Sequence, residues 1–321
     1  MPISQALVTN HVQTWEARLG QSHRRHWPSR LFRHEVLQNA VELIRSGQLL
    51  SRIEAADILQ RDIAPDEIIN LNHSAHEFAR LYFRPRTPTQ YRIEGIRRAE
   101  EIWNGKHAPV IYMFVFRSSQ LLTQDGVFFS RGNMQIPGTE ILDGDEHFSQ
   151  LNFTKIYHEG SYSPEHADIK VWRCAEVLVE SPLVLDQYLE AVVCRSDAER
   201  KTLLHSLGPI ADEWASRIQV MSQPGFFNAE YAFVESVDLS ADGVHVRFHP
   251  RIRLPMEANV TLRVHRTDNP FDRRDFLDRT LDIRKKWKFP FEIAQGLYHV
   301  EIEIESEMAY KNDLTYLTDP F

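Results

Sequence analysis

The sequence predicts an α+β fold, with helices around a mixed β core, followed by a small all-β domain of the immunoglobulin-like sandwich type. Helical spacing and apolar strand segments alternate up to about residue 222, whereas short alternating strands with turn signals fill the remainder. A chain of 321 residues with 42% hydrophobic and 26% charged residues is typical of a two-domain globular protein. We expect a helical arm over 1–27, the α+β domain over 28–222 and the β-sandwich over 227–321.

The spacing of apolar residues places the elements of the first two thirds. Residues 3–19 carry apolar side chains on one helical face. The stretch "HEVLQNAVELIRSG" predicts a helix from Glu35 to Ser46, which Gly47 ends in a left-handed conformation. The other predicted elements are strands at 107–116, 126–130 and 174–181, a short helix and a strand within 183–196, and a helix from Ser196 or Asp197 to Gly208.

The segment after residue 230 has the pattern of an all-β domain. Apolar side chains alternate with polar ones at Tyr298, Val300, Ile302 and Ile304. Turn signals at "ADG", "NP" and "AQG" separate the runs. The predicted strands are "YAFVESVDLS", "GVHVRFHP", "NVTLRVHRT", "LDRTLDIR", "KWKFPFEI" and "YHVEIEIESE".

Composition limits the classes of function and the location. The longest apolar run, "APVIYMFVF", is too short to cross a bilayer, and the first residues lack the pattern of a signal peptide. Two cysteines are too few for a disulfide framework, so we expect a reducing, cytoplasmic location. A net charge of -8 predicts that any contact with nucleic acid is local, through a basic patch.

Several common catalytic motifs are absent from the sequence. There is no HExxH, no P-loop, no GxGxxG after a strand and no GxSxG. The chain has 15 histidines, among them the pair in "HSAH", but no sequence-local ligand set for zinc. We therefore expect no catalytic metal, no ATPase and no Rossmann dehydrogenase.

The stretch "RLYFRPRTPTQY", Arg80 to Tyr91, joins arginines, aromatics and prolines. It is too proline-rich for a helix and too basic for a buried strand, so we expect a stiff loop. Basic side chains next to aromatic rings are what single-stranded nucleic acid binds. A solvated surface with salt bridges is an equally good interpretation of the charges alone.

A glutamate in the predicted strand at 174–181 is a candidate catalytic residue. The strand alternates apolar and polar residues, so we expect one of its faces to be exposed. Alternation places Glu176 on the side of Leu178, which we expect to face a cleft. The alternative is an exposed strand glutamate without a chemical role.

Four of these segments, in this order, resemble motifs of the DarT family. They are "LIRSGQLLS" from Leu43, "LYFRPRTPTQY" from Leu81, "FFSRGN" from Phe128 and "RCAEVLV" from Arg173. The resemblance spans residues 28–208. One segment departs from the family, which opens with "Y-H-x-T" where this chain has "FRHE". Arg33 and Glu35 align with the family's histidine and threonine, or His34 takes the histidine's place after a slip of one residue.

The resemblance implies an ADP-ribosyltransferase fold and an enzyme that uses NAD as co-substrate. Members of the family transfer ADP-ribose to a nucleobase of single-stranded DNA, or of RNA, and release nicotinamide. They are toxins of toxin–antitoxin or phage-defence systems, which implies an antitoxin or regulatory partner protein. The implied site residues are Glu176 and Arg61 for catalysis, Arg33, His34, Glu35, Tyr82 and Asn133 for NAD, and Arg84, Arg86 and Arg92 for nucleic acid.

The chemistry fits these residue types. Breaking the nicotinamide–ribose bond builds positive charge on the ribose, which the carboxylate of Glu176 would stabilise. Arg33 and Arg61 would bind the NAD phosphates, and the ring of Tyr82 would stack on nicotinamide. Two other functions remain open: a catalytically inactive module of the same fold that binds nucleic acid, and a transferase that modifies protein. The β domain is either a docking site for a partner or a stabilising appendage.

Overall fold

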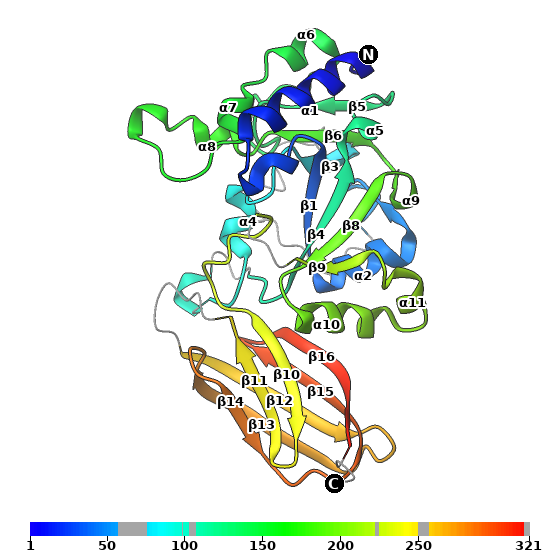
Figure 1. Ribbon diagram of the computed structural model, residues 1–321, viewed down its shortest axis with the longest axis vertical. Helices are drawn as coiled ribbons and strands as arrows, with labels where there is room; N and C mark the ends of the chain where they lie inside the picture. Colours follow the sequence, from blue (N-terminus) through cyan, green and yellow to red (C-terminus); the bar gives the residue numbers. More distant parts are fainter. Residues whose placement is uncertain (57–75, 98, 103–106, 222–224, 250–256, 318–321) are drawn as a thin grey trace. The chain divides into compact units, whose positions relative to one another are not determined.

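The computed structural model describes residues 1–56, 76–97, 99–102, 107–221, 225–249 and 257–317 (Figure 1). The chain divides into two compact units. The first comprises residues 1–92, 113–192 and 223–227, and the second comprises 93–112, 193–222 and 228–321. The first is mixed α/β and the second ends in an all-β region of antiparallel sheets, which confirms the coarse fold prediction.

The first unit is built on a β-sheet. Its strands lie in the order β5 (Val127–Phe129), β6 (Glu176–Glu180), β3 (Phe78–Tyr82), β1 (Arg30–Val36), β4 (Ile111–Arg117) and β8 (Leu189–Cys194). β6 is antiparallel to both of its neighbours, β5 and β3, and β3 is antiparallel to β1. A strand with a neighbour on each side has all of its backbone groups paired, so β6 is a rigid place for a functional side chain.

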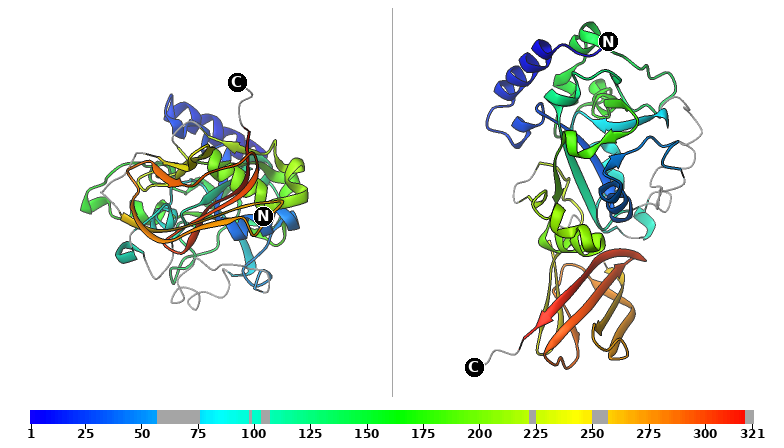
Figure 2. Two further views of the ribbon diagram at one scale, coloured as in Figure 1. Left: turned by 90° about the horizontal axis from the view of Figure 1, so that it is seen from below. Right: turned by 90° about the vertical axis from the view of Figure 1, so that its right-hand side faces the viewer.

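Short helices surround this sheet. They are α1 (Gln5–Leu19), α2 (Leu37–Ser46), α4 (Pro88–Ile93), α5 (Ser118–Leu121), α6 (Gly144–Ser149), α7 (Phe153–Ile156), α8 (Ile169–Trp172) and α9 (Leu185–Tyr188), with 3-10 turns η1 (His23–His26) and η4 (Pro164–His166). A two-stranded sheet pairs β2 (Gln48–Leu49) with β7 (Leu183–Val184). The predicted helix at 3–19 is confirmed as α1, which lies on the outside of the unit beside α6 and α7 (Figure 2).

The second unit combines a helical segment with two antiparallel sheets. The helical elements are η3 (Ala99–Glu101), α10 (Asp197–Leu207), η5 (Gly208–Ile210) and α11 (Ala211–Trp214), with strand β9 (Ile218–Val220) after them. One sheet has the order β10 (Val234–Ser240), β11 (Gly243–Phe248) and β14 (Trp287–Pro290). The other has the order β13 (Arg273–Asp282), β12 (Glu257–Arg266), β15 (Gly296–Ile304) and β16 (Glu307–Tyr316). The inward side chains of both sheets belong to one buried cluster.

Helix ends follow their capping residues. The Ser196 hydroxyl accepts the Glu199 N–H at 3.2 Å and starts α10, which Gly208 ends at a positive φ of 62°. The prediction for this helix is confirmed. Gly47 likewise ends α2 at a φ of 67°. The predicted start at Glu35 is wrong, because the chain stays extended in β1 through Val36 and the helix begins two residues later.

Two further expectations from the sequence are wrong. β6 lies between β5 and β3 in the sheet, and four of its five residues are buried. Because successive side chains point to opposite faces, β6 is buried on both faces rather than exposed on one. The Arg80–Tyr91 stretch is not one loop either. Its first residues end the strand β3, and Pro88 begins α4, where a proline is tolerated because the first N–H of a helix needs no partner. β16 was not predicted, because the apolar residues of "EMAYKNDLTY" do not alternate regularly with polar ones.

None of the helices in the described parts of the chain has both the length and the apolar character that crossing a membrane requires.

Candidate active site

Glu176 begins β6 and is completely buried. Its backbone is fixed on both sides. Its N–H donates to the Ser130 hydroxyl at 3.2 Å, and its carbonyl accepts the Ser130 N–H at 2.9 Å. Across the sheet, Glu176 is paired with Tyr82 on β3, so the two side chains lie on the same face. The interpretation of Glu176 as an exposed strand glutamate is therefore wrong.

The carboxylate of Glu176 has little to compensate its burial. Neither oxygen accepts a hydrogen bond of ordinary geometry from the described residues, and the Arg80 Nη1 is 3.7 Å from Oε2. Burial raises the pKa of Glu176, while Arg80, Arg33 and the backbone amide of Met134 act in the opposite direction. A buried carboxyl without close donors costs free energy that folding alone does not explain. Such a group in a fold is a candidate functional residue.

His34 and Tyr82 form an aromatic pair near Glu176. Their rings are nearly parallel, with an angle of 14° and centroids 5.9 Å apart, and both residues are buried. Burial and the neighbouring Arg33 lower the pKa of His34 to about 3, so its imidazole is neutral at physiological pH. Burial and the charge of Glu176 raise the pKa of Tyr82. The pair offers flat, uncharged surface and hydrogen-bonding groups beside a carboxylate.

Arg33 is held by its own strand, β1, and by the neighbouring strand β3. Its Nε donates to Glu35 Oε1 at 2.6 Å, and its Nη1 donates to the Arg80 carbonyl at 3.2 Å. The other oxygen of Glu35 accepts the Asn39 side-chain amide at 3.3 Å. Although burial acts against the charge, Glu35 and Tyr82 raise the pKa of Arg33. The site therefore contains a fixed cation whose position is set before any ligand arrives.

Asn133 belongs to the segment that follows β5. Its side-chain oxygen accepts the Gln135 N–H at 2.9 Å, and its carbonyl accepts the Thr139 hydroxyl at 3.1 Å. The next residue, Met134, is fully buried against Leu178 of β6. Asn133 thus shapes a loop that borders the strand of Glu176, while its own side chain stabilises the loop.

The three arginines predicted to contact nucleic acid lie in three different environments. Arg84 is buried, donates to the carbonyls of Pro85, Ile156 and His158, and lies 4.8 Å from the centre of the Trp27 ring. The Nε and Nη1 of Arg84 are thus occupied by backbone carbonyls, and its contact with nucleic acid stays a prediction.

Arg86 and Arg92 are placed closer to solvent. Arg86 has a positive φ of 58° and pairs with Glu159 at 2.6 Å. Arg92 is exposed on α4. These two keep the prediction of a basic contact surface, although Arg86 is already neutralised by its partner. Arg61, the other predicted catalytic residue, lies outside the described residues.

Sequence reasoning missed two residues that the fold brings to Glu176. Arg80 was counted only as one member of a basic cluster, yet it is the cation beside the buried carboxyl. Ser130 holds the backbone of Glu176. A signal for Arg80 was present, because alternation in β3 places it on the same face as Tyr82.

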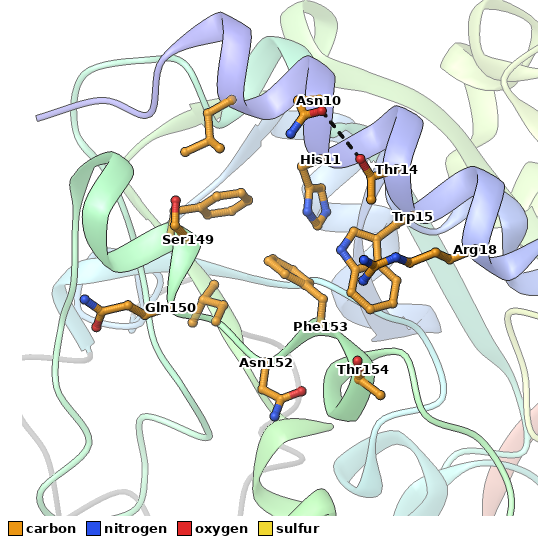
Figure 3. A pocket seen from close by; sticks show the side chains of 13 residues that line it. Asn10, His11, Thr14, Trp15, Arg18, Ser149, Gln150, Asn152, Phe153 and Thr154 are labelled. Carbon is orange, nitrogen blue, oxygen red and sulfur yellow. Dashed lines mark hydrogen bonds between the residues drawn. The ribbon is translucent and has the colours of Figure 1, made fainter.

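A separate cavity of about 510 Å³ lies between α1 and the α6–α7 segment (Figure 3). Trp15, His11 and Phe153 give it aromatic walls, and Asn10 and Asn152 give it amide groups. Burial lowers the pKa of His11 to about 3, so its imidazole is neutral. No residue predicted for the active site lines this cavity.

The chain is similar to one known protein family. The family model described as "ssDNA thymidine ADP-ribosyltransferase, DarT" matches residues 31–227. No curated protein matches the chain.

Solved structures give a similar result. Thermus sp. 2.9 DarT in complex with ADP-ribosylated ssDNA is 19% identical, with a TM-score of 0.50 over 62% of this chain and 96% of that chain. Thermus sp. 2.9 DarT in complex with carba-NAD+ is 17% identical, with a TM-score of 0.48 over 62% and 98%. Thermosipho africanus DarTG in complex with ADP-ribose is 17% identical, with a TM-score of 0.47 over 67% and 54%. The first of these likenesses shows a shared fold.

Proposed function

This chain belongs to the DarT family of ssDNA thymidine ADP-ribosyltransferases, and from that premise we propose how its residues transfer ADP-ribose from NAD to a base of single-stranded DNA. Glu176 is the catalytic carboxylate of this proposal. The observation that carries it is the complete burial of Glu176 on a rigid strand, where neither carboxylate oxygen accepts a hydrogen bond of ordinary geometry from the described residues. A ribose hydroxyl of NAD supplies the missing partner when the co-substrate binds.

The reaction breaks one glycosidic bond and forms another. The bond between nicotinamide and C1 of its ribose breaks, and the electron pair leaves with nicotinamide. A ring nitrogen of the base then attacks that carbon and loses its proton. Glu176 stabilises the positive charge on the ribose and accepts this proton. Burial raises the pKa of Glu176, which makes its carboxylate a stronger base than a solvated one.

The choice of a single strand follows from the chemistry of thymine. N1 of thymine is bonded to the sugar, and the base has no amino group, so N3 is the nitrogen that remains to attack. In a duplex N3 is hydrogen-bonded to adenine inside the stack. The base must therefore be unpaired before it reaches the carboxylate of Glu176.

We propose that the residues around Glu176 bind NAD. Arg33 offers its cation to the pyrophosphate, and the ring pair of His34 and Tyr82 receives nicotinamide. Glu35 keeps Arg33 in place, and Asn133 shapes the neighbouring loop. Arg61 remains a prediction for the residue that covers NAD.

The proposal is tested by transfer of label from NAD. The purified chain is incubated with NAD labelled in its adenylate half and with matched oligonucleotides, single-stranded or duplex, with or without thymine. RNA and total cell protein are further acceptors. We expect label on single-stranded DNA that contains thymine and none on the duplex. Label on protein alone, or release of nicotinamide without any labelled acceptor, would refute it.

Further proposals concern the rest of the chain. The C-terminal region forms an immunoglobulin-like sandwich, which the single core shared by its two sheets supports. The predicted boundaries at 27, 222 and 227 stay a proposal, tested by limited proteolysis. The two free cysteines fit a cytoplasmic location.

An enzyme that modifies the DNA of its own cell must be inhibited, so we propose an antitoxin or regulatory partner protein. We further propose RNA as a second substrate and defence against phage as a biological role of the same activity. The edge strands β13 and β16 are places where a partner strand can add. Toxicity on expression that Glu176→Gln abolishes is the expected sign of such a need. Equal growth of cells expressing either form would contradict it.

A further inference from the structure

Three neighbouring strands of the second unit carry an imidazole or a carboxyl at the same level. His265 on β12 is paired with His299 on β15, and His299 is paired with Asp313 on β16. Directly opposite residues of antiparallel strands project to the same face. The three side chains therefore form one row across the sheet, and the ring centroids of His265 and His299 are 5.1 Å apart.

Helix α10 adds a fourth side chain to this row. His205 lies in its last turn, and its ring centroid is 5.1 Å from that of His299. The ligand atoms of His205, His299 and Asp313 all lie within 4.8 Å of one another, and each residue is partly buried. Two imidazoles and a carboxylate at this spacing, from three separate elements, are a typical donor set for zinc.

We propose that His205, His299 and Asp313 bind a divalent transition-metal ion, with zinc as the best fit to the donor set. His265 occupies the fourth position after a side-chain rotation. The site goes beyond the proposed transfer reaction and shares no residue with the Glu176 site.

The spacing suits an ion after a small closure. Zinc lies about 2.0–2.1 Å from a histidine nitrogen, which places two ligand atoms of a tetrahedral site about 3.4 Å apart. In the structure the ligand atoms lie up to 4.8 Å apart, so a pair of them must approach by about 1.4 Å at most, a distance within reach of side-chain rotation. His299 Nδ1 and Asp313 Oδ1 are 2.6 Å apart in a hydrogen bond, so this pair opens by about 0.8 Å when both atoms bind one ion.

The neighbouring cations already have acidic partners. Lys311 pairs with Glu301 at 2.7 Å and Arg273 pairs with Asp275 at 2.6 Å. Glu301 also lies 3.4 Å from His299, so it adds negative charge near the ion.

A bound ion would fasten α10 to the sheet of β12, β15 and β16. An ion that binds the folded chain alone raises its stability by RT ln(1 + [metal]/Kd). The expected role is therefore structural, and chelation is expected to lower thermal stability while the labelled-NAD transfer remains measurable below the melting temperature.

The test uses the full chain without a histidine tag. Metal content after purification is measured by mass spectrometry, and Zn²⁺ is titrated into the chelator-treated chain by calorimetry. We expect about one ion per chain, and a loss of affinity on the order of 100-fold or more in His205→Asn and His299→Asn. Substitution with Co²⁺ is expected to give the visible absorption of a tetrahedral site. A cluster of hydrogen-bonded side chains that binds no ion would not show this absorption.

The matched control is His245→Asn. His245 also pairs with an aspartate, Asp242, at 2.9 Å in the same unit, but it is exposed and has no second histidine in its group. Its substitution is expected to leave the affinity for Zn²⁺ unchanged. Absence of binding to the parent chain, or equal binding by His205→Asn and the parent, would overturn the proposal. His205 is partly exposed on a helix, so its substitution leaves the fold intact.

Discussion

Two buried glutamates, one in each unit, are alike in burial and differ in their partners. Glu176 on β6 and Glu199 on α10 are both fully buried, and burial raises the pKa of both. Glu199 accepts the Arg195 backbone N–H at 2.8 Å and the Arg195 Nε at 2.9 Å, with a further contact to Nη2. Neither oxygen of Glu176 accepts a hydrogen bond of ordinary geometry from the described residues, and its ion pair with the Arg80 Nη1 spans 3.7 Å.

The difference separates a structural carboxyl from a functional one. A buried carboxylate that accepts two hydrogen bonds from an arginine side chain is compensated inside the fold, and its removal takes the closest acidic partner from a buried cation. A buried carboxylate without such partners contributes nothing to folding that a neutral side chain would not. It is retained, we infer, for a ligand. The direction of the pKa change alone does not distinguish the two, because it is the same for both.

The largest expected effect is on catalysis. Glu176→Gln keeps the shape of the side chain and removes the charge that opposes the cation on the ribose. We expect the rate of ADP-ribose transfer to fall on the order of 10³-fold. Single-turnover transfer of label to thymine-containing DNA measures it. A variant within tenfold of the parent would remove Glu176 from the mechanism.

The same variant makes a prediction about stability. The pKa of Glu176 is raised in the folded chain above the ordinary value of 4.5. A raised pKa means that the folded state binds the proton more tightly, so the parent loses stability as pH rises above about 4.5. Glu176→Gln is expected to match the parent at pH 4 and to be more stable at pH 8. Thermal melts across this range test the sign.

Glu199→Gln should show the opposite behaviour. It removes the carboxylate that Arg195 contacts most closely and leaves that buried cation with Glu94 at 3.9 Å, at an expected cost of about 3 kcal/mol in the free energy of unfolding. Transfer activity measured well below the melting temperature is expected to stay within a few fold of the parent. Denaturant unfolding followed by fluorescence gives the first quantity. Full stability of Glu199→Gln would show that the contrast between the glutamates is not one of pairing.

Substitution of Arg80 tests the pKa of Glu176, the proposed catalytic carboxyl. Its cation favours the charged form of Glu176, so Arg80→Gln is expected to raise that pKa further. The acidic limb of the pH profile of kcat/KM then moves to higher pH. Once that limb has passed neutrality, activity at pH 7 falls roughly 10-fold for every further rise of one in the pKa of Glu176. Arg80→Lys keeps the charge and is the matched control. A profile that does not move would mean that Arg80 acts elsewhere.

The contrast between the glutamates also explains what the sequence predicted and what it did not. Periodicity and capping residues identified α1, α10 and most strands, because these signals are local. Strand alternation singled out Glu176, and the family resemblance implied its role and that of Tyr82; the structure places the two residues opposite each other on neighbouring strands. Burial of β6 on both faces was missed, since it depends on which strands become its neighbours.

Other contacts were missed for the same reason. The cluster of His205, His299 and Asp313 is built from residues far apart in sequence, so no spacing rule for metal ligands identifies it. The basic stretch from Arg80 to Tyr91 was interpreted as one surface, yet its arginines contact different partners. Local sequence shows that charge is present, whereas long-range packing decides which charges are compensated.

Arg84 and Arg92 give a second comparison between a buried and an exposed charged residue. The expected effect, on binding of DNA, is the smallest of those predicted. Arg92 is exposed, and Arg92→Gln is expected to weaken binding of single-stranded DNA a few fold and to lower the salt dependence of log K by about 0.7. Arg84→Gln is expected to lower stability, because Arg84 is buried among carbonyls, and to leave the salt dependence unchanged. Fluorescence anisotropy at several salt concentrations measures both. A changed slope in folded Arg84→Gln would mean that burial does not separate structural arginines from those that contact DNA.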